Sequence, residues 1–180
     1  MCNYTFNYKT DVTIVHQFTM DGVKLLEHAV WGALFSRNLV DRPMRMENLR
    51  GVIDTYSQYV NVYAGGASKT LLQTAVTNAD ASVVHELISH NANVNIAYHS
   101  PKGYIDCLSE IFYLSEEPDR LEIAYALMDA GADVNTKRTI PGISLLDESR
   151  KSNDHDFTYL LHHFKVHDDY EAYDDYGKQE

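Results

Sequence analysis

The chain has 180 residues, of which 44% are hydrophobic and 23% charged, with 9 Gly and 4 Pro. This length fits roughly one domain, and this composition is that of an ordinary globular chain, which excludes a wholly disordered or fibrous protein. The 15 Lys and Arg residues are outnumbered by 26 Asp and Glu, so the formal net charge is −11. Because a protein this acidic repels the phosphate backbone of nucleic acids, we expect no nucleic-acid partner.

The N-terminal segment, residues 1–21, alternates apolar and polar side chains. Tyr4, Phe6 and Tyr8 form one such run, and a second run follows to Ile14. A period of two predicts a short strand or an extended arm. We expect this arm to cover the apolar face of the first structural unit.

The compartment follows from cysteine usage and hydropathy. Only Cys2 and Cys107 are present, too few for a disulfide framework, and the start of the chain has neither a basic nor an apolar leader region. No apolar run approaches the roughly 18 residues of a membrane span. We therefore expect an intracellular, cytoplasmic protein without a membrane partner.

Two short segments in the middle of the chain are near copies of each other. Residues 91–95 read NANVN, residues 131–135 read GADVN, and each follows a helical pattern. A fainter copy gives three endings, at Asn61, Asn95 and Asn135, which are spaced 34 and 40 residues apart. A period close to 33 residues is typical of a repeat protein, in which each repeat is one supersecondary unit.

The most regular of these units resembles the ankyrin repeat. Residues 70–75 read TLLQTA, similar to the family's T-P-L-H-x-A, with Leu71 in place of Pro and Gln73 in place of His. Asn91 stands where the family usually has Gly after the second helix, and Asn also adopts the left-handed backbone needed there. The resemblance implies an all-α fold, a solenoid of stacked helix-turn-helix units with β-turn fingers.

The repeat pattern divides the chain into an arm, an ankyrin-repeat domain over 22–165 and a tail. The expected units and tail span about 22–61, 66–95, 103–135, 142–164 and 166–180. The third unit contains about one extra helical turn or a longer bend near 116–119, and the first has an extra connection over 38–45. A unit cannot bury its apolar stripe alone, so stacking forms the core. Leu87 belongs to this predicted core.

Function in such a stack comes from its concave face, formed by the turn tips and the first helices. The predicted fingers, 63–69, 97–102 and 136–141, each carry a cation, and recurring cations in an acidic chain form a basic strip that attracts an acidic partner. Ordinary solvation of exposed turns is the alternative explanation. The candidate partner-binding residues are Tyr63, Lys69, Tyr98, His99, Lys102, Tyr113, Lys137 and Arg138.

An enzyme is the alternative of a different class. In that reading Cys107 is a nucleophile and His99 is its base. No activating signature surrounds either residue, Cys is commonly buried, and the sequence has no GxSxG, HExxH or Gly-rich phosphate loop. We therefore expect no catalytic residues and no cofactor.

The nine His residues raise the question of a metal site near the C-terminus. His163 and His167 are four residues apart, so on a helix they share one face, and Asp168 follows; His162 points elsewhere. The alternative, which we favour, is a polar helix end that leads into the tail. We therefore predict no metal site.

The tail combines carboxylates with Tyr170, Tyr173 and Tyr176. Residues 168–180 hold six acidic residues and one Lys, a net charge of −5. Such a segment is expected to be a disordered, solvated tail. The alternative is that it docks on a basic surface, either on the partner or on this protein's own fingers.

The resemblance also suggests a modification. Asn95 and Asn135 each follow a Leu by eight residues, as in substrates of asparaginyl hydroxylases of animal cells. The alternative, which we favour, is that these side chains cap the turn through backbone hydrogen bonds.

The resemblance implies a non-enzymatic protein–protein interaction module, an adaptor or inhibitor, that binds a protein partner through its concave face. The short, divergent array with almost no appended domain suggests a second version, a pathogen- or virus-encoded effector. Such an effector would bind and inhibit a host protein in the host cytoplasm.

Overall fold

The structure is a computed structural model, which describes residues 22–35, 40–63, 69–100, 103–114, 117–135 and 144–166. These residues form α2 (Gly22–Leu34), α3 (Arg42–Tyr56), η1 (Ser57–Tyr59), α4 (Leu71–Thr77), α5 (Ala81–Ser89), β1 (Tyr98–Ser100), β2 (Gly103–Ile105), α6 (Cys107–Glu110), η2 (Ile111–Leu114), α7 (Arg120–Asp129), α8 (Leu145–Lys151) and α9 (His155–Val166). The predicted helical class is confirmed, with one two-stranded antiparallel sheet added to it. The predicted arm lies outside the described residues, as does the tail beyond Val166, the last residue of α9.

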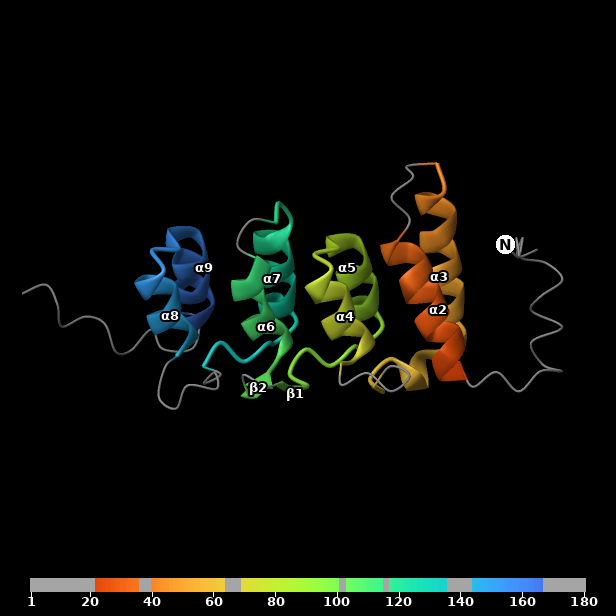
Figure 1. The fold of residues 1–180 in the computed structure, drawn as a ribbon, viewed down its shortest axis with the longest axis horizontal. Helices are drawn as coiled ribbons and strands as arrows, with labels where there is room; N and C mark the ends of the chain where they lie inside the picture. The colour runs from red at the N-terminus through yellow and green to blue at the C-terminus, as the bar shows by residue number, and fades with distance from the viewer. Residues whose placement is uncertain are drawn as a thin grey trace, which may run out of the picture.

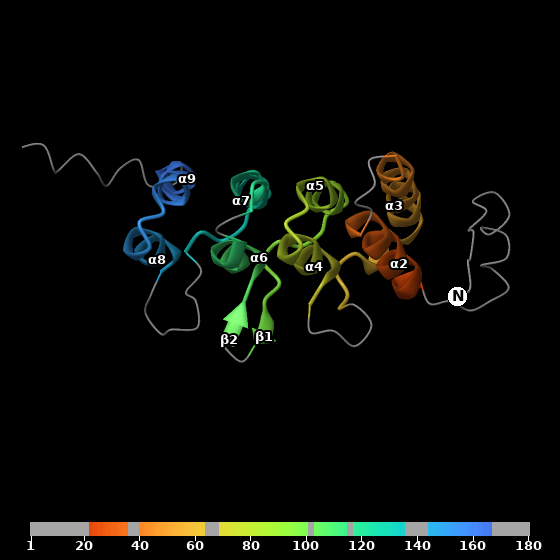
Figure 2. The same ribbon diagram turned by 45° about the horizontal axis from the view of Figure 1, so that its top comes forward.

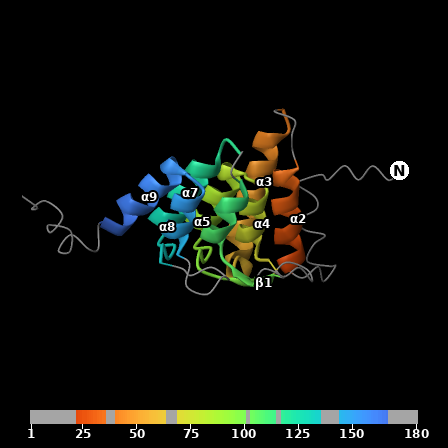
Figure 3. The ribbon, with the colours of Figure 1, turned by 60° about the vertical axis from the view of Figure 1, so that its left-hand side comes forward.

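The α-helices lie as four pairs, α2/α3, α4/α5, α6/α7 and α8/α9, side by side along the long axis of the molecule (Figure 1). Figure 2 shows two layers: α2, α4, α6 and α8 form the inner layer, and α3, α5, α7 and α9 form the outer layer. The β1–β2 hairpin projects on the side of the inner layer. Viewed from the C-terminal side, the pairs follow one another from α8/α9 back to α2/α3 (Figure 3).

The inner-layer helices α4, α6 and α8 begin at equivalent capping residues. The side chains of Thr70, Asp106 and Ser144 each accept a hydrogen bond from the backbone N–H three residues further on. Around Thr70 and Ser144 the bond is reciprocated, which completes a capping box. Each cap satisfies a backbone donor that the first helical turn leaves unpaired, and this local chemistry sets where the helix begins.

Left-handed residues follow α5 and α7, where the chain leaves one pair for the next. Asn91 has φ 63° and Gly131 has φ 87°. After α5 the Ala92 N–H donates to the Leu87 carbonyl at 3.0 Å, as in a Schellman motif. The prediction that Asn91 takes the conformation usually given to Gly is confirmed.

Asparagine side chains join the ends of successive pairs. The Asn61 amide donates to the Asn91 carbonyl at 3.2 Å and accepts from the Asn93 N–H at 2.6 Å. Asn95 makes the same two bonds one pair further along, to the backbone of residues 131–133, at 2.9 and 2.8 Å. The repeated endings seen in the sequence therefore lie beside one another, because each Asn bridges to the turn of the next pair.

Arginines link the outer-layer helices at their N-termini. Arg42, at the start of α3, donates to Asp80, the N-cap of α5, at 2.6 Å. Arg120, at the start of α7, pairs in bidentate fashion with Asp154, which precedes α9. The hydrogen bond from Arg120 lowers the pKa of Asp154, the effect expected of a cation beside a carboxylate.

The structure defines the two predicted irregular connections. The expected connection over 38–45 is wrong in its second half, because α3 begins at Arg42 with Pro43 in its first turn. Proline is tolerated there, since the first-turn N–H has no helical partner. In the third pair, η2 continues α6 and supplies the extra turn.

His90 connects α5 to α3 on the outer layer. Its Nε2 lies 3.0 Å from an oxygen of Asp54, and its Nδ1 lies 2.8 Å from the Glu86 carbonyl. Glu86 also pairs with Arg50 at 2.7 Å. The hydrogen bond to the Glu86 carbonyl has the largest effect on the pKa of His90. Together with the carboxylates of Asp54 and Glu86 it outweighs burial, so the pKa of the imidazole is raised.

A raised pKa in the folded state means that protonated His90 stabilises the fold. We expect this contribution to be full below the ordinary His pKa of about 6.5 and to disappear as pH rises through the higher folded-state value. The amount is at most about 1 kcal/mol, the range for exposed ion pairs. Urea unfolding of wild type and His90→Gln on both sides of this window measures it. An unchanged pH profile in His90→Gln would contradict the assignment.

Candidate protein-binding site

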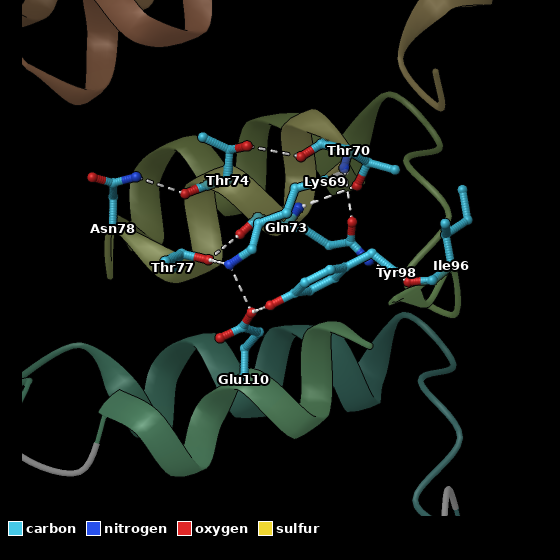
Figure 4. Close-up of polar contacts among 9 residues, drawn as sticks. All are labelled: Lys69, Thr70, Gln73, Thr74, Thr77, Asn78, Ile96, Tyr98 and Glu110. Carbon is cyan, nitrogen blue, oxygen red and sulfur yellow. Dashed lines mark hydrogen bonds and ion pairs between the residues drawn. The ribbon is translucent and has the colours of Figure 1, made fainter. Parts of the chain in front are cut away.

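A polar cluster joins the inner-layer helices α4 and α6 to the β hairpin (Figure 4). The Lys69 ammonium donates to Glu110 at 2.8 Å and lies 4.7 Å from the centre of the Tyr98 ring. The Tyr98 hydroxyl donates to the same carboxylate oxygen of Glu110. Lys69 also donates to the Thr77 hydroxyl at 2.8 Å. Three segments of the chain, the first finger, β1 and α6, therefore meet at one carboxylate, and α4 joins them through Lys69.

Gln73 attaches the second finger to α4. Its side-chain oxygen accepts from the Thr70 N–H at 2.7 Å, and its amide nitrogen donates to the Ile96 carbonyl just before β1. Gln73 is fully buried, so both ends of its amide are used away from water. Gln73 thus ties a finger to the helix behind it.

The cluster has a defined charge state. Burial has the largest single effect on the pKa of Lys69 and lowers it, because it disfavours the charged ammonium. The interactions with Glu110 and Tyr98 together outweigh burial, so the pKa of the ammonium is raised. Burial also raises the pKa of the Tyr98 phenol, and its hydrogen bond to Glu110 acts in the same direction. At neutral pH Lys69 is therefore a cation, and Tyr98 is a neutral phenol that donates a hydrogen bond to Glu110.

Two predicted contact residues, Lys69 and Tyr98, are engaged inside the molecule. The Tyr98 residue is 8% exposed and the Lys69 side chain 25% exposed. The charge of Lys69 is balanced by Glu110, which comes from the next unit. Both residues therefore orient the finger, and the surface that a partner could touch lies on other side chains.

That surface carries aromatic residues from both described fingers; we call Tyr63, His99 and Tyr104 the finger surface. Tyr63 is 52% exposed, Tyr104 is 68% exposed, and His99 is exposed as well. The Tyr63 hydroxyl donates to the Ala97 carbonyl at 3.4 Å, which links the first finger to the second. The His99 and Tyr104 rings meet edge to face, 5.3 Å apart. Tyr and similar rings are enriched among residues that dominate protein–protein binding.

Tyr104 was missed by the sequence analysis. Recognition of the hairpin would have pointed to Tyr104, because His99 pairs with Tyr104 across the two strands and Ser100 pairs with Gly103. Gly103 has φ 103°, a conformation that favours Gly and permits the turn back. Because the predicted finger ended at Lys102, the second strand and its exposed ring were left out.

The remaining predicted contact and modification residues are scattered. Tyr113 lies on η2 and is 45% exposed, whereas Lys102, Lys137 and Arg138 lie outside the described residues. Asn95 and Asn135 are exposed. Their N–H groups donate hydrogen bonds to the side-chain oxygens of Asn93 and Asp133, two residues earlier, at 2.9 and 2.8 Å. The predicted turn cap thus comes from the preceding side chain, while the Asn95 amide bridges to the next pair.

The two residues of the enzyme hypothesis have contrasting surroundings. Cys107 is 0% exposed at the start of α6, and burial is the main cause that raises the pKa of its thiol. His99 is exposed on β1 and packs against Tyr104. A buried thiol with a raised pKa is a poor nucleophile, because the thiolate is the reactive form.

Two of the histidines near the C-terminus, His162 and His163, contact different side chains. His162 lies 3.1 Å from the Arg150 guanidinium, while the His163 ring contacts Phe164. His167 and Asp168 lie outside the described residues. Within the part of the chain that is described, no three His, Cys, Asp or Glu side chains gather in a way that would hold a metal ion.

None of the helices within the described ranges has the length and hydropathy to span a bilayer. Comparison with models of known protein families and with curated proteins gave no match to this chain. The site's chemistry is therefore the basis for a functional assignment.

Proposed function

We propose that this protein is a non-enzymatic protein-binding module, an adaptor or inhibitor built from ankyrin-like repeats. It binds a protein partner with an acidic surface through the finger surface and the adjoining inner layer. The observation that carries the proposal is the group of exposed aromatic rings at Tyr63, His99 and Tyr104, on fingers joined by a hydrogen bond. Exposed aromatic rings gathered at one place are a common feature of binding sites.

The ankyrin-like interpretation is supported by equivalent features at equivalent positions. The pairs lie in a row (Figure 1), and three inner-layer helices begin at capping residues of one type. Left-handed residues end α5 and α7, and Asn side chains bridge successive turns. Each pair buries its apolar stripe against its neighbours, as in a repeat array.

The acidic character of the partner is argued from charge. Residues 62–79, 96–105 and 136–146 contain no Asp or Glu, although the chain has 26 of them. Because Glu110 neutralises Lys69, the remaining finger cations are Lys102 in the second segment and the pair at 137–138 in the third. A strip without carboxylates on an acidic molecule directs an acidic partner to that strip.

A quantitative pull-down from cell lysate tests the proposal. We expect a protein that is retained by the wild-type chain to be lost with Tyr104→Ser. With the purified partner, loss of a central aromatic contact should weaken binding by about 2 kcal/mol, or roughly thirtyfold. Binding should also weaken as salt is raised, because the contact is partly electrostatic.

The matched control is Tyr159→Ser on α9, since Tyr159 is 75% exposed but belongs to the outer layer. This variant should bind the partner as the wild type does. An equal loss of partner binding in both variants would refute the proposed site. A partner whose affinity is unchanged by substitutions in the finger surface would refute it as well. Circular dichroism of each variant ensures that the comparison is made on folded protein.

A further inference from the structure

The first three inner-layer helices expose side chains at equivalent positions. In each, a buried leucine is followed three residues later by another buried side chain: Leu26 and Ala29, Leu72 and Ala75, Leu108 and Ile111. Five residues after each leucine the side chain is exposed, at Trp31, Thr77 and Tyr113. Because the spacing from the buried face is the same, these three residues occupy the same position on successive helices. We call them the inner-helix row.

Thr77 shows which side of the molecule the inner-helix row faces. Its hydroxyl accepts a hydrogen bond at 2.8 Å from Lys69, which belongs to the first finger (Figure 4). The row therefore lies on the side of the fingers, where the β hairpin also projects (Figure 2). Packed helices lie roughly 8–10 Å apart, so Trp31 and Tyr113 stand about 16–20 Å apart, with Thr77 between them.

The two ends of the inner-helix row are aromatic. Trp31 stacks on Phe35 with ring centres 5.1 Å apart and planes 3° from parallel. Trp31 is 40% exposed and Phe35 62% exposed, and at the other end Tyr113 is 45% exposed. Lys24, His28 and Trp31 form the exposed stripe of α2. The row therefore offers two aromatic contact points, separated by the polar Thr77.

Charge separates this face from the outer layer. Helices α2, α4, α6 and η2 contain two carboxylates, Glu27 and Glu110. Oε1 of Glu27 is buried, and Glu110 is 4% exposed and paired with Lys69. The exposed carboxylates on helices of the first three pairs all lie in the outer layer: Glu47, Asp54, Glu122 and Asp129. The inner face thus carries the exposed cation Lys24 and no exposed carboxylate on these helices.

We propose that the partner contributes one continuous acidic segment, which lies along the inner-helix row from α2 to η2. One apolar side chain of this segment packs on the Trp31–Phe35 pair, and a second packs on Tyr113. The aromatic contacts supply most of the affinity, while the acidic residues select the carboxylate-free face over the acidic outer layer. The inference rests on the proposed function and extends its site from the fingers onto the helices.

The test uses the partner purified after the pull-down. Trp31→Ser and Tyr113→Ser should each weaken binding about tenfold, because each removes one aromatic contact. The matched control is Tyr125→Ser, since Tyr125 is 49% exposed but lies on α7 in the outer layer. This variant should bind as the wild type does. Lys24→Glu should also weaken binding, and stronger binding in this variant would overturn the acidic character of the segment.

Fluorescence tests the contact without altering the fold. Trp31 is the only tryptophan of the chain. Acrylamide quenching of Trp31 should fall about twofold when the partner binds, because an apolar side chain then covers the indole. The complex of Trp31→Phe supplies the background from tryptophans of the partner.

The outcomes separate this inference from the proposed function. If Tyr104→Ser loses the partner while Trp31→Ser and Tyr113→Ser keep it and quenching is unchanged, the inference is overturned and the finger site stands. If Tyr104→Ser also keeps the partner, the proposed function itself fails.

Discussion

Replacement of Lys69 by Ala should lower the free energy of unfolding by about 3–5 kcal/mol, the cost of leaving one member of a buried ion pair without its partner. The Glu110 side chain is 5% exposed, and its charge is balanced by Lys69 at 2.8 Å. Without the ammonium, the Tyr98 hydroxyl and the remaining surroundings cannot supply a full opposite charge. Urea unfolding followed by circular dichroism measures the loss.

The double variant Lys69→Met, Glu110→Leu separates the pair from its packing. Replacing both charges by apolar groups should recover most of the stability, because no buried charge is then left uncompensated. The control is Lys24→Ala on the exposed stripe of α2, which should change stability by less than about 0.5 kcal/mol. A loss in Lys69→Ala no larger than in Lys24→Ala would show that the cluster does not hold the finger.

Replacement of Leu87 by Ala should cost about 2–5 kcal/mol, because the side chain is 0% exposed in α5 and its removal leaves a cavity. Helix α5 packs against α4, α7 and α3, so the cavity lies at the junction of three pairs. The matched control is Ile88→Ala, which removes the same number of carbons from a partly buried neighbour. We expect a clearly smaller loss there; equal losses would place Leu87 outside the core. Denaturant midpoints of the two variants provide the comparison.

Features that depend on neighbouring residues were predicted well. The left-handed Asn91 was expected from the residue type at a helix end, and the buried positions followed from helical periodicity. Leu87 is fully buried, in agreement with the spacing on which its prediction rested. The expected connection over 38–45 was too long, because α3 already begins at Arg42, and Pro43 is tolerated in its first turn.

The candidate site was predicted less well, because its roles depend on contacts between units. Lys69 and Tyr98 looked like surface contacts as long as their partner was unknown. That partner, Glu110, is 41 residues from Lys69 along the chain. Similarly, Tyr104 became a candidate once the hairpin register placed it opposite His99.

Local sequence was therefore sufficient for the helical class and the repeated endings, since backbone preference and periodicity act over a few residues. Three-dimensional packing was needed to distinguish the polar residues that form contacts inside the molecule from those that stay exposed at its surface. A side chain's burial and charge balance are set by whatever lies opposite it, and in a row of helix pairs that neighbour comes from the next unit. For this reason Lys69 holds a finger in place, while Tyr63, His99 and Tyr104 remain exposed.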